Sequence, residues 1–177
     1  MSLFVDAFKA TLLGGGARPN LFRVTVPFPI ASGASAGTTL RNSFLCKAAQ
    51  LPASTIENIA VPFRGRSINL AGDRSFESWS ITVINDVDFS IRDGFEQWMN
   101  FINTHETNTG VATPISYKQD LTVTQLDKSG LPLKNYVFRG AYPSSVGSID
   151  LSYDTTNSIE EFSVEFQIDY WTSNTTL

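Results

Sequence analysis

The chain has 177 residues, of which 42% are hydrophobic and only 17% are charged, and its formal net charge is −4. Soluble domains carry about 25% charged residues, so much of this surface must be uncharged and suited to contacts with other proteins. The acidic balance argues against a nucleic-acid binder, because neutralising phosphates requires an excess of Lys and Arg. The length predicts one compact domain with no second domain.

The cysteine content and the N-terminal residues indicate the cellular compartment in which the protein is expected. Cys46 is the only cysteine, which excludes an internal disulfide and a multi-cysteine zinc site. A reduced, intracellular site of assembly fits best. The N-terminus lacks the basic region and the uninterrupted apolar stretch of a secretory signal. No stretch approaches the ~18 consecutive apolar residues of a membrane span, so we expect no membrane segment.

Residues 1–18 are expected to form an N-terminal arm. Phe4 and Phe8 belong to an apolar patch with partial helical spacing, and Gly14-Gly15-Gly16 after it is predicted to be a hinge. A frayed terminus is the alternative interpretation. Two phenylalanines need burial, however, which argues against mere fraying, and the surface that covers them could be another subunit.

Residues 19–177 are predicted to form a single β domain. Short apolar or alternating segments predict strands at 21–26, 44–49, 79–83, 121–124, 131–139, 149–153 and 162–170. Asp127 to Gly130 predicts a hairpin turn, and Gly140 to Pro143 predicts another turn. Two excursions are expected, at 27–42 and 53–73. Within them, 30–42 is predicted to be a loop or loose hairpin, and Arg64-Gly65-Arg66 a turn between two apolar pieces.

One amphipathic helix is predicted, ending near Asn103. Apolar residues recur at helical spacing, and Ser90 with Asp93 resembles a capping box at its start; the apolar positions are Ile91, Phe95, Trp98 and Ile102. With the strand pattern, this predicts a mainly β fold, a β-sandwich or open β-barrel of antiparallel strands with one flanking α-helix over an open edge.

The last predicted strand has one apolar and one acidic face. Phe162, Val164, Phe166, Ile168 and Tyr170 alternate with Glu161, Ser163, Glu165, Gln167 and Asp169. The apolar set is expected to anchor the core. The carboxylates, with Glu160, are expected to be solvated, the default for a strand's outer face. Arg64, Arg66 and Arg74 could match such carboxylates across a subunit boundary, or simply solvate a loop.

The sequence offers few candidate catalytic or metal-binding residues. His105 is the sole histidine and lies in a polar loop, so a multi-histidine metal site is impossible and an exposed histidine is expected. Cys46 is expected to be a buried, unreactive thiol. Asp86 and Asp88 are explained by turn formation and helix N-terminal charge. We therefore expect no catalytic residues, no metal site and no cofactor, and infer that the chain is not an enzyme.

Particular residues carry a family resemblance. They are Ala17-Arg18-Pro19-Asn20-Leu21-Phe22, Cys46-Lys47-Ala48, Leu51-Pro52-Ala53, the stretch Ile68 to Phe76 with its Ala-Gly-Asp-Arg-Ser-Phe piece, Trp79, Asn85-Asp86, Val146 to Ile149, and Phe162 to Trp171 with its terminal Asp-Tyr-Trp. Across most of its length the chain resembles the tail tube proteins of T4-like bacteriophages, which form the inner tube of contractile tails.

The resemblance implies a self-assembling virion protein. Six-membered rings would stack into a hollow tube inside the tail sheath, with sheets joined into a continuous β-barrel and DNA passing through without specific binding. Further partners would be the sheath protein, the baseplate and the tail terminator, and assembly would occur in the host bacterial cytoplasm. The segment 27–42 is longer than expected for the family, and an external or sheath-facing hairpin is one interpretation.

Candidate contact residues follow from the same resemblance. Those expected between rings or subunits are Phe4, Phe8, Arg18, Asn20, Arg64, Arg66, Asp73 and Arg74. Those expected to face the lumen are Glu161, Glu165 and Asp169. A ring of six chains would carry a charge of −24, six times −4, so a net acidic channel that repels phosphates is predicted.

Two other functions stay open at this point. The first is the tube subunit of another contractile injection machine, such as a bacteriocin or a secretion-type system, which shares the mechanism but not the DNA cargo. The second is a carbohydrate-binding β-sandwich or hydrolase, suggested only by Trp79, Trp98 and Trp171. Periodic placement favours core packing for Trp79 and Trp98.

Overall fold

The computed structural model describes residues 2–12, 16–33 and 36–176. Its helices are α1 (Ser2–Thr11), the 3-10 turn η1 (Ile30–Ser32), α2 (Ala36–Leu45), α3 (Ser90–Ile102) and α4 (Pro114–Tyr117). Its strands are β1 (Phe22–Thr25), β2 (Cys46–Ala49), β3 (Thr55–Phe63), β4 (Arg66–Ser75), β5 (Trp79–Ile84), β6 (Gln119–Leu126), β7 (Pro132–Val146), β8 (Glu161–Gln167) and β9 (Tyr170–Ser173).

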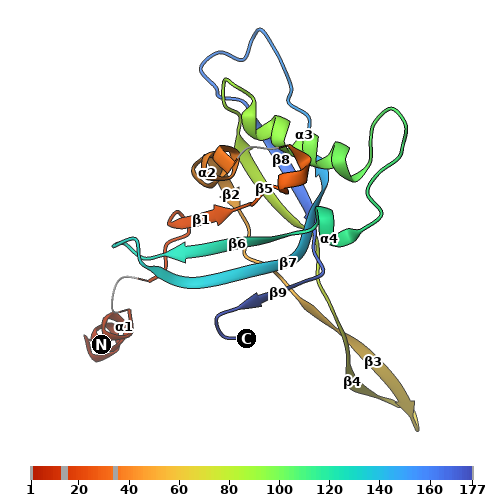
Figure 1. Ribbon diagram of the computed structural model, residues 1–177. Coiled ribbons are helices and arrows are strands. Elements are labelled where there is room, and N and C mark those ends of the chain that lie inside the picture. Colours follow the sequence, from red (N-terminus) through yellow and green to blue (C-terminus); the bar gives the residue numbers. More distant parts are fainter. Residues whose placement is uncertain (1, 13–15, 34–35, 177) are drawn as a thin grey trace.

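Seven strands form one antiparallel sheet that curls on itself. Their order is β1-β6-β7-β8-β5-β2, and β9 joins by pairing with β7. The end strands β1 and β2 lie close together, so the sheet forms an open barrel (Figure 1). Alternating residues such as Val24, Val123 and Val164 fill its interior. The prediction of a mainly β open barrel of antiparallel strands is confirmed.

The long strand β7 connects the two halves of the barrel. It pairs with β6 and β9 through residues up to 141 and with β8 from Tyr142 onward. Gly140 stands at this change of partners with φ +62°, and a Cβ there would meet the Asp169 carboxylate. The predicted turn at Gly140 to Pro143 is therefore wrong. The strand continues, and glycine supplies the left-handed backbone that the corner requires.

Aromatic side chains make up much of the core. Trp79 stacks on Phe138 at 4.3 Å between ring centroids, and both are buried. Helix α3 adds Phe95, whose ring meets Phe162 and Phe166 on the inner face of β8. The predicted helix is confirmed, but it covers this inner face rather than an open edge of the sheet.

The predicted capping box of α3 is wrong. The residue before the helix is Phe89, in the left-handed region at φ 53°, and no side chain caps the helix. The hydroxyl of Ser90 instead donates to Asp86. The spacing of Ser90 and Asp93 matched the pattern, but Ser90 lies within the helix and not before it.

Three further predictions about secondary structure are wrong. The predicted loop at 30–42 contains η1 and most of α2, with Thr38 and Asn42 buried. The predicted strand at 149–153 is irregular, and Leu151 and Tyr153 are exposed. The predicted last strand is divided, since β8 ends at Gln167 and β9 begins at Tyr170 against a different partner.

Two elements project from the barrel. Strands β3 and β4 form a separate two-stranded sheet, which extends as an arm at the lower right of Figure 1. Helix α1 stands apart on the other side of the molecule (Figure 1). The predicted excursion at 53–73 is thus a regular hairpin. The predicted hinge falls largely outside the described residues, which include only Gly16 of its three glycines.

Candidate functional site

Helix α1 carries an apolar stripe that the chain itself leaves in solvent. Phe4, Val5, Phe8 and Leu12 recur at helical spacing, and Phe4 and Phe8 are 85% and 64% exposed. A helix with one apolar side gains its stability from packing that side against another surface. The predicted contact residues Phe4 and Phe8 therefore belong to a surface suited to binding another molecule.

The hairpin β3–β4 has a second exposed apolar surface. Ile59 pairs with Leu70, Val61 with Ile68 and Phe63 with Arg66. Because paired residues point to the same side of a sheet, one face carries five large apolar side chains. These five, Ile59, Val61, Phe63, Ile68 and Leu70, are between 41% and 58% exposed, and we call them the hairpin strip. The other face includes Asn58, which donates to Asn69 at 3.0 Å.

Charged residues lie at both ends of the hairpin. Arg64 and Gly65 form the tip with positive φ, and the Arg64 guanidinium lies 5.3 Å from the centre of the Phe63 ring. Arg66 begins β4 at the tip, while Asp73 and Arg74 lie near its base. The structure thus places these four predicted contact residues on one projecting element. It does not bring them together with Phe4 and Phe8.

Trp171 on β9 fixes the base of the hairpin. Its indole Nε1 donates to the carbonyl of Ala53, just before β3, at 3.0 Å. Its ring also meets the edge of Phe76, just after β4, at 6.3 Å between centroids. One side chain of the barrel therefore contacts the chain both where it enters the hairpin and where it leaves it, at the base of the projecting arm. Sequence reasoning missed this role, although the Asp-Tyr-Trp motif marked the residue.

The predicted contact residues Arg18 and Asn20 lie between α1 and β1. Both are exposed. The carbonyl of Arg18 accepts hydrogen bonds from the Leu21 amide at 3.2 Å and from the Gln125 side chain at 3.3 Å. The bond from Gln125 attaches the segment to β6. The two side chains therefore lie at the root of the predicted arm, next to the barrel.

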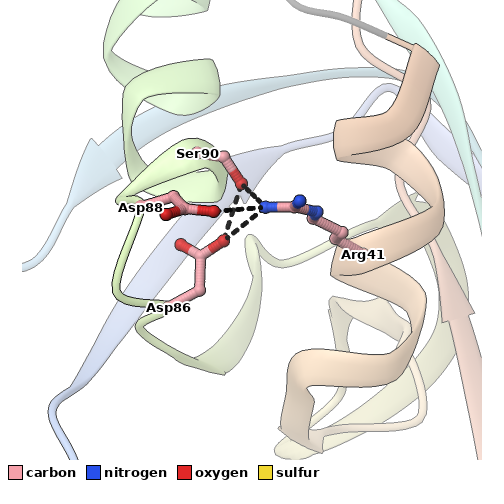
Figure 2. Close-up of polar contacts among 4 residues, drawn as sticks. All are labelled: Arg41, Asp86, Asp88 and Ser90. Atoms are coloured by element: carbon pink, nitrogen blue, oxygen red, sulfur yellow. Dashed lines mark hydrogen bonds and ion pairs between the residues drawn. The ribbon is translucent and has the colours of Figure 1, made fainter.

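A polar cluster joins α2 to the start of α3. Figure 2 shows Arg41 Nη1 donating to Asp86 at 3.3 Å, Asp88 at 3.2 Å and Ser90 at 3.2 Å. Ser90 also donates to Asp86 at 2.7 Å. Partial burial acts to raise the pKa of Asp86, but the hydrogen bonds from Ser90 and Arg41 outweigh it and hold this pKa below its usual value. The cluster is a clamp between two helices.

Sequence reasoning missed the Arg41 clamp because it assigned Arg41 to a loop. Asp86 and Asp88 were expected to serve the turn and the helix start. Asp86 does accept the Phe89 amide through its carbonyl, but both carboxylates also bind Arg41. Thr38 and Asn42, four residues apart, are buried, but as small polar residues they give no apolar periodicity by which the sequence could have predicted this helix.

The predicted lumen-facing carboxylates have partners on the same chain. Glu161 binds Lys47 Nζ at 2.6 Å, Glu165 accepts from Ser78, and Asp169 binds Lys118 at 2.7 Å. Glu161 and Glu165 share the outer face of β8. Asp169 lies between β8 and β9, against Gly140, so the three do not form one surface.

The remaining candidate reactive side chains, Cys46 and His105, lie in positions that do not indicate a reactive site. Burial raises the pKa of Cys46 to about 12, so the thiol stays protonated near neutral pH, and His105 is exposed in its loop. In the described ranges, no three His, Cys, Asp or Glu residues gather as a metal site would require. Helices long and apolar enough to cross a membrane are likewise absent from these ranges.

The tryptophans form no exposed aromatic platform. Trp79 and Trp98 are buried and donate their indole N–H groups to the carbonyls of Gln50 and Tyr117. The expectation of core packing for these two residues is confirmed. Trp171 is partly buried and occupied by the hairpin base. An open barrel with two projecting apolar surfaces defines a class of protein that associates through its surface.

Comparison with known proteins identifies the family. The family model described as phage tail tube protein matches residues 17–174, and the chain belongs to this family. It is 34% identical over 171 residues to the tail tube protein gp19 of Enterobacteria phage T4, covering 96% of this chain and 99% of the relative. The tail tube protein of Serratia phage KSP90 is 31% identical, covering 92% and 93%. The resemblance seen in the sequence is confirmed.

Solved structures share the fold at much lower identity. A chain of the sheath-tube complex of the extracellular contractile injection system PVC has a TM-score of 0.60 at 14% identity, covering 94% of this chain and 96% of that one. A chain of the anti-feeding prophage baseplate has a TM-score of 0.59 at 14% identity, covering 89% and 95%. The open barrel is therefore the fold of proteins in contractile injection systems.

Proposed function

We propose that this chain is the ring-forming subunit of the inner tube of a contractile phage tail. Six copies join into a ring, and rings stack into a hollow tube through which DNA passes without specific binding. The observation that carries this proposal is the 34% identity to the T4 tail tube protein over 96% of this chain. The role is structural and not catalytic.

Free sheet edges supply the means of joining copies. Among the described residues, β1, β2 and β9 each pair with a single strand. An unpaired edge presents backbone N–H and C=O groups to another chain, which monomeric proteins usually prevent. Here edge pairing would close a ring, while heterologous contacts along the axis would let the tube grow.

The projecting elements supply the contacts between rings. Phe4 and Phe8 of α1 expose an apolar surface, as does the hairpin strip. With them we assign Arg18, Asn20, Arg64, Arg66, Asp73 and Arg74 to contacts between copies. Growth along an axis requires each copy to offer two different surfaces that fit each other, and the chain has two such projections on separate sides (Figure 1).

The outer face of β8 is our candidate for an acidic channel wall. It carries Glu161 and Glu165, and among the described residues only Glu161 has an ionic partner, Lys47. The face keeps a negative balance that would discourage phosphate binding. Asp169 contributes less, because Lys118 neutralises it. A tube structure with a basic lumen would contradict this assignment.

Partners beyond the chain itself follow from the relatives. The fold recurs in chains of a sheath-tube complex, a sheath/tube terminator and a baseplate. We therefore propose contacts with a tail sheath, a baseplate and a tail terminator, in a virion assembled in the host cytoplasm. A tube subunit of another contractile injection machine is the second candidate, favoured by the TM-score of 0.60 with the PVC chain.

Negative-stain microscopy of the purified full chain tests the proposal. Hollow rods of constant diameter, with sixfold rings in end-on averages, are expected. A protein that stays monomeric at every concentration tested would overturn it. Rods that form equally well with and without DNA would agree with a tube that does not bind its cargo specifically.

A further inference from the structure

The chain displays two apolar surfaces that match each other. One is the α1 stripe of Phe4, Val5, Phe8 and Leu12, and the other is the hairpin strip. They lie far apart on one molecule (Figure 1). Each remains in water in the single chain, where exposed apolar area of this kind is unfavourable. Both surfaces can be covered if each meets the other on a different copy.

The two surfaces agree in length. From Phe4 to Leu12 an α-helix rises about 12 Å. From Ile59 to Phe63 an extended strand spans about 13 Å. A helix lying along the hairpin strip would therefore cover it from end to end.

Their charges also agree along the long axis. The hairpin tip carries Arg64 and Arg66, and its base carries Glu57, Asp73 and Arg74. The tip is thus positive and the base has a net negative charge. A helix has partial positive charge at its N-terminus and partial negative charge at its C-terminus. Lys9 stands in the last turn of α1, and its unit charge outweighs the partial negative charge there, so we expect this end of α1 at the acidic base and the first turn at the tip.

The charged side chains of α1 are compatible with this placement. Asp6 lies on the side away from the stripe and stays in solvent. Lys9 lies beside the stripe, where its stem can cover apolar surface while its amine remains hydrated. Neither residue has to be buried.

We propose that α1 of one copy binds the hairpin strip of a second copy. This proposal rests on the proposed function, because it names the surface that receives the N-terminal element in the assembly. It assigns Val61 and Ile68 to the centre of the contact, opposite Phe8. The exchange links each copy to two others, one through its helix and one through its hairpin.

Cross-linking between two singly substituted proteins tests the proposal. Phe8→Cys and Val61→Cys are prepared separately, mixed with an excess of unsubstituted protein, assembled and oxidised. The native Cys46 is buried and gives little background. Ser67→Cys replaces Val61→Cys in the control, because Ser67 pairs with Pro62 on the opposite face of the same hairpin.

The expected result is a disulfide-linked dimer of Phe8→Cys with Val61→Cys, at least about tenfold more abundant than with Ser67→Cys, since a disulfide requires close Cβ atoms. Tubes that form without this dimer, or with equal amounts for both faces, would overturn the inference and leave the tube function standing. Unsubstituted protein that forms no tubes would overturn both.

Discussion

Gly140 shows how one residue controls the corner of the barrel. Its φ of +62° and its contact with Asp169 occur where β7 changes partners. We expect Gly140→Ala to lower the free energy of unfolding by about 1–2 kcal/mol from backbone strain alone, and further because its Cβ displaces the carboxylate. Chemical denaturation measures the loss. Gly130→Ala is the matched control, since Gly130 has φ +82° but nothing within 4 Å of its Cβ position.

The difference between the two variants isolates the Asp169 contact. Equal losses for Gly140→Ala and Gly130→Ala would show that Asp169 moves aside without cost. In that case the lysine partner, Lys118, would have to follow, because it lies 2.7 Å from the carboxylate.

Cys46 offers a direct probe of core integrity. Because burial raises the pKa of its thiol to about 12, the reactive thiolate is scarce at pH 8. We expect negligible alkylation of the native protein at pH 8 and rapid alkylation in denaturant, measured by mass spectrometry. Rapid labelling of the native protein would show that β2 opens readily at the end of the sheet.

At the scale of elements, the base of the hairpin depends on Trp171. Trp171→Phe removes the N–H that binds Ala53 but keeps a ring beside Phe76. We expect a loss of about 0.5–1.5 kcal/mol and faster amide exchange at residues 53–76, followed by hydrogen-exchange mass spectrometry. Tyr170→Phe, next to it on an exposed position of β9, is the control and should leave the hairpin unchanged.

The stability of the packing between α2 and α3 depends on the charge of the carboxylates that bind Arg41. The folded pKa of Asp86 lies below its unfolded value of about 3.9, so the clamp stabilises the fold at higher pH and is lost as pH falls through the folded pKa. We expect Asp86→Asn to be less stable than the unsubstituted protein at pH 7, and the difference in stability to shrink as the pH falls below about 3.9, measured by circular dichroism. Asp88→Asn should have a smaller effect, because Asp88 is far more exposed.

The sequence predicted the helices and strands whose apolar pattern is visible in the local sequence. Its predictions were wrong where contacts with residues distant in the chain determine the conformation. Strong alternation in β5 and β8 and the spacing of Phe95 and Trp98 sufficed for the barrel and α3. The small polar residues of α2 have no such pattern, and its helix is stabilised by packing on β1 and α3. Gly140 was assigned to a turn because only the tertiary corner reveals that its strand continues.

The candidate contact surfaces could be predicted from the sequence only where the signal is local. Exposed Phe4 and Phe8 could be inferred, because nothing nearby in the chain offered them a core. The hairpin strip could have been found from the alternation of Ile59, Val61 and Phe63. The Trp171 contact with Ala53 could not, since it joins residues that are 118 positions apart.

At the scale of the whole molecule, we propose that α1 is an assembly element and not a part of the fold. Deleting Met1 to Gly16 should leave the unfolding midpoint of the barrel unchanged, because Phe4 and Phe8 are exposed. Tubes should become shorter or scarcer, as counted by electron microscopy. Asp6→Ala, on the polar side of α1, should assemble normally. Unchanged tube length and yield after the deletion would contradict the role of the arm.

The contact between Trp171 and Ala53 also sets an order of events during synthesis. The ribosome must add 118 residues after Ala53 before the indole that fixes the hairpin base exists. At about 5–20 residues per second, this takes roughly 6–24 s. Until then the hairpin lacks this contact at its base. Unfinished chains would therefore be poor partners for finished ones, and incorporation into a growing tube would select molecules whose translation has passed β9.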